Sequence, residues 1–443
     1  MKKMFVISLL LLLTIAMTAS VFADDYSPLP GVLGPDDVDF DGETVTIYGL
    51  NLTDNTRVYV GWDNYDQELF QERLAKAEEL FNVKIEGKLG GNASIITNRI
   101  LAGDSVNDIY VEPHRDLGYF GLVSDSMLYP VGEFLSEDYY DSLTNVDRSI
   151  SEKLKYQNEY YTFGSVMGPI NDSMMFQVYN KDILEAENQP DPYELWLEGE
   201  WTWETFEQIA KVVTRDTDGD GTIDQWGTYP IQDVGVFRFL PSNAGLELTR
   251  VEEDGKVVFN FDTSLAINSL NVITRWMQEE EFTGSEGTVV FWDSHIAGIR
   301  NDKASGDFEY GIVPMPKGPD SERHYFPAFS FHSAALPANA DNPEGLVALF
   351  EYLFRPDDDE MRWDPALAHL MDISITSREQ WEVVMTGAES WRGEGDHFQW
   401  SGLWDVVVPY TDEVIAGERG AASAMNSVAP EAQAYLDDLF KQE

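Results

Sequence analysis

Residues 156–181 divide the chain into two parts, and this division constrains the fold more than any other feature of the sequence. The stretch contains two short β-rich runs, residues 159–163 and 174–179, separated by two glycines and a proline within residues 164–169. Gly and Pro at this spacing are typical of turns and crossings, because they interrupt regular elements. We therefore predict that the chain first passes between two lobes near residues 164–169.

The part of the chain before this stretch alternates strand patterns with helix patterns. Apolar residues recur at helical spacing in two segments, and short apolar runs typical of strands lie on either side of them. The predicted strands are residues 44–50, 83–86 and 108–111, and the predicted helices are residues 66–81 and 95–102. A β-α-β-α-β order with short links predicts a parallel sheet covered by helices.

The part after the crossing predicts a second α/β unit. Thr202 is a candidate N-cap for a helix over residues 203–213, whose apolar side chains fall on one face. A second crossing is predicted at residues 311–316, where a strand-like run ends in Pro316. The remaining predicted elements are helices at 181–187, 265–277 and 343–354, strands at 288–292 and 333–337, and a helical tail from residue 355.

Length and charge exclude several classes of protein. A chain of 443 residues is too long for one ordinary core and fits two domains. The net charge of −50 at pH 7 repels phosphate backbones and anionic lipid head groups, so no nucleic-acid or membrane-surface binding is expected. The chain has no Cys, which removes a disulfide framework and thiolate metal sites.

The first residues have the pattern of a secretory signal peptide. Lys2 and Lys3 precede an apolar run over residues 4–17, and Val21-Phe22-Ala23 provides a small-residue cleavage site before Asp24. We expect residues 1–23 to be removed and residues 24–43, which are rich in Pro, Gly and Asp, to form a flexible leader. No Cys follows the site, so we expect no lipid anchor and a periplasmic or secreted protein.

Several blocks in a fixed order give the chain a family resemblance. The aromatic pair and Gly/Pro crossing at residues 160–169 precede YNKD at 179–182, WTWETF at 201–206 and an acidic segment at 216–224. In this order the chain resembles the extracellular solute-binding proteins of sugar importers, the group that includes maltose-binding protein. The resemblance implies a binding protein that works as a monomer, captures a soluble mono- or oligosaccharide and delivers it to a membrane ABC permease.

The resemblance also implies an α/β fold of the periplasmic-binding-protein-like type II class. Two α/β lobes would be joined by a hinge, with the ligand cleft between them. Residues 44–167 with 312–354 would form the first lobe, and residues 168–311 with 355–443 the second. Closure of the lobes would remove the captured sugar from water and bring polar groups of both lobes onto it.

Sugars need flat aromatic side chains to stack on and carboxylates, amides or Arg to hydrogen-bond their hydroxyls. Parallel α/β sheets bind ligands beyond the carboxyl ends of their strands, which makes the loops at residues 61–64, 90–92 and 112–115 candidate segments. The candidates in these loops are Trp62, Asp63, Asn92, Glu112, His114 and Arg115. The resemblance points again to Glu112, His114 and Arg115, and adds Asn171, Asp172, Trp292, Trp400 and Trp404.

Each of these candidates has a structural alternative. A single Trp is as readily explained by core packing as by ligand stacking, and Glu112 with Arg115 could form a solvated salt bridge. The chain also departs from well-known members of the family, because Glu112-Pro113 stands where an aromatic residue is usual. This departure argues against a preference for maltose.

The acidic segment matches most of a calcium loop of EF-hand type. Asp216, Asp218, Asp220, Thr222 and Asp224 supply oxygen ligands at positions one, three, five, seven and nine, with a Gly at position six. Position twelve is Gly227 where the motif requires Glu, so further ligands would come from elsewhere. The prediction is a structural Ca²⁺ ion; the alternative is a surface turn rich in Asp and Gly.

Catalytic signatures are scarce, which favours a binding protein over an enzyme. The chain contains no G-x-S-x-G, no H-E-x-x-H and no phosphate-binding Gly-rich loop. Two alternatives remain open: a secreted glycosidase or lyase, and a binder of peptides or amino compounds on the same fold. In the second alternative, Asp63 or Asp172 would bind the amine.

Overall fold

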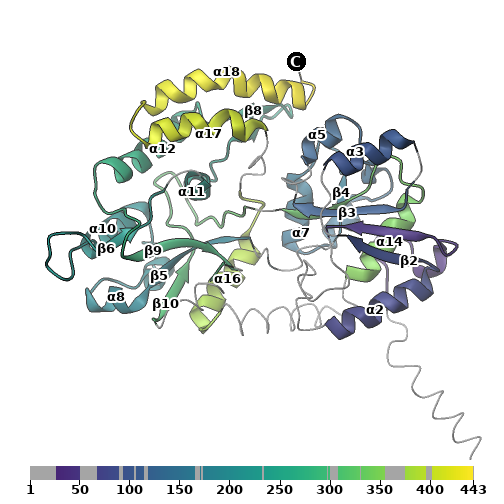
Figure 1. Cartoon of the computed structure of the whole chain (residues 1–443), viewed down its shortest axis with the longest axis horizontal. Coiled ribbons are helices and arrows are strands. Elements are labelled where there is room, and N and C mark those ends of the chain that lie inside the picture. Colours follow the sequence, from purple (N-terminus) through teal and green to yellow (C-terminus); the bar gives the residue numbers. More distant parts are fainter. Residues whose placement is uncertain are drawn as a thin grey trace, which may run out of the picture.

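The computed structural model shows two α/β lobes side by side (Figure 1). The described residues are 26–49, 67–88, 93–103, 106–113, 118–164, 170, 173–231, 234–296, 298–299, 308–329, 331–354, 375–395 and 402–442. Each lobe is built on its own sheet, as predicted for two separate α/β units. The lobes take strands from both sides of the crossing segments, so the chain passes between them more than once.

The sheet of the first lobe has the strand order β2-β1-β3-β11-β4. β1 pairs in parallel with β2 and β3, as the β-α-β-α-β pattern predicts, and β11 pairs antiparallel with β3 and β4. The strands are β1 (Thr44–Tyr48), β2 (Lys84–Lys88), β3 (Asp108–Pro113), β4 (Thr162–Phe163) and β11 (His332–Ala335). The sheet is therefore mixed, with its parallel part formed by the N-terminal strands.

Helices cover the first sheet. Val45, Ile47 and Ile109 point into a core that α14 completes with Leu346 and Phe350. The helical segments of this lobe are η1 (Pro35–Asp37), α2 (Gln67–Leu80), α3 (Ala93–Ala102), α5 (Tyr119–Ser124), η2 (Val131–Glu133), α6 (Glu137–Asp141), α7 (Asn145–Lys153) and α14 (Pro343–Phe354). All of them except η1 bury apolar side chains, and α14 is buried on every side from Gly345 to Phe354.

The segment before β1 differs from the flexible leader expected for residues 24–43. From residue 26 onward it packs on the first lobe, where Leu29, Val38 and Phe40 are buried in the same core as α14. The backbone N–H of Phe40 donates a hydrogen bond to the carbonyl of Phe81 at 3.0 Å. The expectation of a flexible leader rested on the high content of Pro, Gly and Asp, and it was wrong. Three spaced apolar side chains are buried and hold the segment on the first lobe.

The sheet of the second lobe has the strand order β10-β5-β9-β6. Only β6 and β9 pair in parallel; β5 is antiparallel to β9 and β10. The strands are β5 (Met175–Asn180), β6 (Gln225–Thr228), β9 (Thr288–His295) and β10 (Tyr310–Val313), and a separate hairpin is formed by β7 (Thr249–Val251) and β8 (Val257–Phe259). This sheet is thus largely antiparallel.

The helices predicted at residues 181–187, 203–213 and 265–277 all form in the second lobe, whereas the helices at residues 192–197 and 234–239 were not predicted. Thr202 caps α10 by accepting a hydrogen bond from the N–H of Thr205, and Phe206 and Ile209 lie on its buried face. The helical segments are α8 (Lys181–Ala186), α9 (Pro192–Leu197), α10 (Trp203–Val213), α11 (Val234–Phe239), η3 (Leu240–Ser242), α12 (Ser264–Gln278), α16 (Arg378–Ser390), α17 (Gly402–Ile415) and α18 (Ala421–Leu439). The capping residue and the 3.6-residue period together explain why α10 begins and packs as predicted.

Two passages of the chain run side by side between the sheets. Phe163 pairs with Ala334 in the first lobe, and Met174 forms a bridge with Ala328 beside the second sheet. The N–H of Met175 donates to the carbonyl of Pro327 at 2.7 Å. The two passages are therefore hydrogen-bonded to each other both in the first sheet and beside the second.

The second passage begins later than the predicted crossing at residues 311–316. Gly311 lies on β10 and pairs with Tyr179 inside the second sheet, so the chain leaves this sheet after Val313. A Cβ at Gly311 would lie 2.1 Å from the Tyr179 ring. This Gly is required by close packing within the sheet and not by a turn between lobes, which is why the sequence pattern was misleading.

The lobes also touch at the C-terminal end of the chain (Figure 1). Phe440, which follows α18, packs on Phe120 and Tyr156 of the first lobe, with ring centroids 5.4 Å away in each case. The hydroxyl of Tyr156 donates to the carbonyl of Leu439 at 2.9 Å. The last helix of the second lobe is therefore fastened to the first lobe.

A charged network links α10 to α12 within the second lobe. The Glu207 carboxylate accepts hydrogen bonds from Arg275 Nη2 at 2.5 Å and from the Trp276 indole at 2.6 Å. The hydrogen bond from Arg275 is the main reason that the pKa of Glu207 falls to about 2. The charged form of Glu207 is thus favoured by folding.

We predict that this network contributes to acid stability. The contribution of Glu207 is present above pH ~4.5, the ordinary pKa of Glu, and is lost as the pH falls toward its folded value of about 2. Glu207→Gln should therefore lower the free energy of unfolding at pH 7 and flatten its fall between pH 4.5 and 2. Denaturant unfolding over this range measures the effect, with Glu204→Gln, an exposed change on the same helix, as control. Equal pH slopes in the wild type and Glu207→Gln would contradict it.

Candidate functional site

The carboxyl end of β9 lies beside the connection between the lobes. His295, the last residue of β9, pairs with Met175, which itself hydrogen-bonds to Pro327 of the second passage. Phe329 continues that passage, and its N–H lies 3.4 Å from the carbonyl of Ser173. Side chains at this end of β9 are therefore placed where the two lobes meet.

Four side chains from three parts of the chain gather at this point. Arg238 of α11 donates from Nη1 to Asp293 Oδ2 of β9 at 3.0 Å. The Arg238 guanidinium carbon lies 5.6 Å from the centre of the Phe329 ring, and the His295 and Phe329 rings meet edge to face at 4.8 Å. We call Arg238, Asp293, His295 and Phe329 the hinge cluster.

The hinge cluster is accessible and chemically mixed. The side chains of Arg238 and Asp293 are 29% and 32% exposed, so both retain surface for a ligand. A guanidinium offers several N–H donors in one plane, and a carboxylate offers acceptors, so the pair can hydrogen-bond neighbouring hydroxyls. An aromatic ring beside such a pair is typical of small-molecule sites, which combine apolar walls with a few polar groups.

Sequence reasoning missed these residues because it ended the strand too early. The predicted strand stopped at Trp292, whereas β9 continues to His295. Side chains alternate along a strand, so Asp293 and His295 share the face of Phe291 and Trp292 lies on the other face. Extending the alternation by three residues would have placed Asp293 and His295 together at the end of β9.

The two tryptophan candidates that the structure describes are both packed against other rings. Trp292 is partly buried, with its ring in an edge-to-face contact with Phe308 at 6.0 Å. Trp404 is 5% exposed and lies 4.1 Å from the ring of Phe237, one residue before Arg238. Trp404 therefore supports α11 from within the core, which was the structural alternative considered for each Trp.

Of the other predicted ligand residues, the structure describes only the backbone of Glu112. Glu112 lies on β3, where its backbone is opposite Ser333. The remaining candidates lie outside the described residues and stay predictions: Trp62, Asp63, Asn92, His114, Arg115, Asn171, Asp172 and Trp400. Of these, Asn171 and Asp172 immediately precede Ser173, whose carbonyl accepts a hydrogen bond from the N–H of Phe329.

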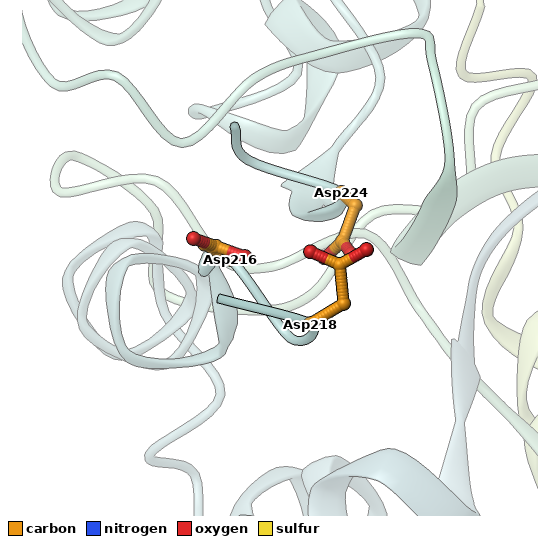
Figure 2. Close-up of side chains that lie close together, drawn as sticks. All are labelled: Asp216, Asp218 and Asp224. Atoms are coloured by element: carbon orange, nitrogen blue, oxygen red, sulfur yellow. The ribbon is translucent and has the colours of Figure 1, made fainter. Parts of the chain in front are cut away.

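The acidic loop between α10 and β6 brings three of its carboxylates together. Asp216, Asp218 and Asp224 each offer an oxygen within 4.8 Å of the others, and Figure 2 shows Asp218 and Asp224 directed toward each other. Asp220 is not part of this group; its Oδ1 accepts a hydrogen bond from the N–H of Thr222 at 2.7 Å. The loop thus brings together three of the five predicted ligands, those at positions one, three and nine.

Backbone groups stabilise the charges of this loop. Asp216 accepts hydrogen bonds from the N–H groups of Gly221 at 2.7 Å and Gly219 at 2.6 Å, and the Gly221 bond is the main cause of its lowered pKa. Gly221 has φ +94°, a conformation that Gly adopts without strain. The structure therefore accounts for the Gly at position six, with or without an ion.

Position twelve of the loop cannot hold the Glu of an EF-hand. Gly227 lies on β6, and a Cβ there would be 2.6 Å from the carbonyl oxygen of Ala210 on α10. The strand leaves no room for a side chain because it packs directly on the helix. Any ion at this loop would have to complete its coordination with water or other oxygens.

Two α/β lobes, antiparallel pairing between residues 173–175 and 327–329, and a polar cluster beside this pairing are the arrangement of a two-lobed binding protein. A family model described as bacterial extracellular solute-binding protein matches residues 61–360, which is more than half of the 443-residue chain. The chain belongs to this family. Its members are binding proteins, and the family description places them outside the cytoplasm.

Solved structures share this fold at low sequence identity. The maltose/maltodextrin-binding domain MalE from Bdellovibrio bacteriovorus, bound to maltotriose, is 15% identical with a TM-score of 0.56, covering 89% of this chain and 99% of that one. An ABC substrate-binding protein from Listeria monocytogenes, in complex with cycloalternan, is 13% identical with a TM-score of 0.58, covering 91% and 100%. A solute-binding protein from Thermotoga lettingae, bound to α-D-tagatose, is 15% identical with a TM-score of 0.55, covering 89% and 100%.

No curated protein matches the sequence. Within the part of the chain that the structure describes, no helix has both the length and the apolar character needed to span a bilayer. The family is thus established by the family model, and the likeness to solved structures supports the fold.

We predict that Trp404 stabilises the second lobe from within. Trp404→Ala should lower the free energy of unfolding by about 3–5 kcal/mol, because it removes a buried indole ring from the core. Urea unfolding at pH 7 measures this loss. Leu101→Ala, at a side chain that is 73% exposed, is the control and should change stability by no more than about 0.5 kcal/mol. A similar small change for Trp404→Ala would show that its ring is not part of the core.

Proposed function

We propose that this protein captures a carbohydrate between its two lobes and delivers it to a membrane ABC permease. The observation that carries the proposal is the hinge cluster, where Arg238 lies against Phe329 and pairs with Asp293, and where both charged side chains are partly exposed. Sugar hydroxyls both donate and accept hydrogen bonds, so they match a paired guanidinium and carboxylate. Relatives of the same fold that carry maltotriose, cycloalternan or tagatose support this choice of ligand class.

Capture would work by closure of the lobes around the ligand. The sugar would first bind at the carboxyl end of β9, with Arg238 and Asp293 on its hydroxyls. Turning about the paired segments at Met174 and Ala328 would then bring the first lobe onto its other side. The ligand stabilises the closed form only to the extent that it contacts both lobes, so groups from the first lobe must complete the site.

The first-lobe groups would be those predicted from the sequence. The candidates are Trp62, Asp63, Asn92, Glu112, His114 and Arg115, and the passages between the lobes add Asn171 and Asp172. Trp292 and Trp400 remain proposed as stacking surfaces, whereas Trp404 would act through its support of α11. In this proposal no bond of the sugar is made or broken.

A protein that captures a sugar for import would work outside the cytoplasm and bind a membrane permease. The N-terminal pattern at residues 1–23 would export the protein, which would then work as a monomer in the periplasm or as a secreted protein. A closed, loaded form would dock on a membrane permease coupled to a cytoplasmic ATPase. The strongly acidic surface would keep the protein soluble during this diffusion.

We also propose that the acidic loop binds a structural Ca²⁺ ion. Asp216, Asp218 and Asp224 would supply three oxygens, and Asp220 and Thr222 would join them after small side-chain or backbone adjustments. The backbone bonds to Asp216 support the alternative of an ion-free turn equally well. A direct measurement of calcium dependence therefore decides between them.

Ligand screening by thermal shift tests the proposed function. We expect a matching saccharide, at a hundredfold over its dissociation constant, to stabilise the protein by about 2.7 kcal/mol and to raise the melting temperature. Peptides and amino acids serve as the control set and should produce no shift. Stabilisation by peptides or amino acids alone would contradict the proposal and favour the amino-compound binder. Release of new reducing ends or unsaturated products from a glycan would identify an enzyme.

Calcium addition tests the acidic loop. After dialysis against chelator, we expect Ca²⁺ to raise the melting temperature of the wild type and to leave that of Asp216→Asn/Asp218→Asn nearly unchanged. The ion relieves repulsion among the carboxylates and gains their oxygens as ligands. Asp254→Asn, an exposed change in the β7–β8 turn, is the control. A wild type whose melting temperature does not respond to Ca²⁺ has an ion-free turn.

A further inference from the structure

Arg238 pairs with Asp293 through only part of its guanidinium group. Arg238 donates to Asp293 through one nitrogen, Nη1, at 3.0 Å, so the remaining guanidinium donors are not used by this pair. Arg238 Nε is covered and has no hydrogen-bond partner among the described residues. The guanidinium is held on two sides, by Asp293 of β9 and by the ring of Phe329.

We propose that Asp293 sets the charge selectivity of the site, so that it accepts neutral sugars and rejects acidic sugars such as uronates. This inference rests on the proposed function, because it concerns the ligand class of the same site. Asp293 cancels the charge of Arg238, and the pair offers donors and acceptors with no net charge. The site thereby differs from one with an unpaired Arg, which binds a carboxylate by two parallel hydrogen bonds.

Hydrogen-bonding capacity explains the preference for neutral sugars. A hydroxyl group can accept from Arg238 and donate to Asp293 at the same time, so both partners stay satisfied when the ligand displaces water. A carboxylate can only accept. Placed on Arg238, it would also bring a second negative charge close to Asp293, and like charges in a part-buried site repel strongly. This is selectivity by an unfavourable contact with the wrong ligand.

The local pair is distinct from the acidic surface of the whole protein. The net charge of −50 also opposes anionic ligands, but salt screens it over roughly 8 Å at 0.15 M ionic strength. An ionic contact within the site is screened much less. If the preference for neutral sugars persists at 0.15 M ionic strength and is lost when Asp293 is substituted, the Arg238–Asp293 pair causes it.

Matched sugars that differ only at C6 test the proposal. The probes are glucose, galactose and mannose with glucuronate, galacturonate and mannuronate, together with the corresponding trisaccharides. Binding is measured by calorimetry in 0.15 M salt at pH 8, above the ordinary pKa of a His such as His295. The proteins are the wild type, Asp293→Asn, Asp293→Ser and the control Glu253→Gln. The control removes one negative charge at an exposed position in the β7–β8 turn.

The wild type and Glu253→Gln should bind the neutral sugars, and should bind each uronate at least about tenfold more weakly than its neutral counterpart. In Asp293→Asn and Asp293→Ser, the ratio of uronate to neutral-sugar affinity should rise by about 10- to 100-fold, the range covered by a hydrogen bond to a charged group. Adding Arg238→Gln to Asp293→Asn should remove the gain, because the guanidinium is the group that binds the carboxylate. Two different substitutions of Asp293 keep the test valid if one fails to fold.

Three results would overturn the proposal. The first is a wild type that binds a uronate as tightly as its neutral counterpart. The second is an unchanged affinity ratio in folded Asp293 variants. The third is an equal rise in Glu253→Gln, which would assign the selectivity to overall charge. The first two still leave carbohydrate capture intact. A wild type that binds no saccharide would instead overturn the proposed function together with this selectivity.

Discussion

The pairing between the two passages of the chain is the constraint on which the rest of the structure depends. Met174 with Ala328, and Met175 with Pro327, hold the segments together beside the second sheet. At the other end, Phe163 pairs with Ala334 in the first sheet. Pairing at both ends ties the two passages to each other, so neither passage can move independently at these positions.

This connection also creates the candidate site. Phe329 belongs to the second passage, and it lies against Arg238 of α11 and His295 of β9. In the proposed function, a side chain that belongs to both the paired passages and the polar cluster would link ligand binding to the position of the lobes. Elsewhere the lobes meet through Phe440 and Tyr156, so any turning at the hinge must be accommodated by this second contact. Further contacts join the lobes between Asn145 and the carbonyls of Ala388 and Trp391, and between Lys153 and Glu247.

Most elements of the fold could be predicted, but the site could be predicted only in part. Residues 203–213 and 343–354 form α10 and α14 with the predicted bounds, and α10 has the predicted Thr202 cap and one buried apolar face. The leader and the second crossing were misjudged because Leu29 and Gly311 act through distant partners. The same holds for Arg238, which becomes a candidate only through its pairing with Asp293, 55 residues away.

The sequence by itself determined the class of protein: two α/β units, a Gly/Pro-rich crossing, and an order of blocks that resembles solute-binding proteins. These features are local, since periodicity, caps and turn residues act within a few positions of each other. Only the tertiary structure decided which polar side chains meet, because Arg238, Asp293 and Phe329 come from α11, β9 and a passage between lobes. Their proximity depends on how the sheets pair and where the chain crosses, which no local pattern encodes.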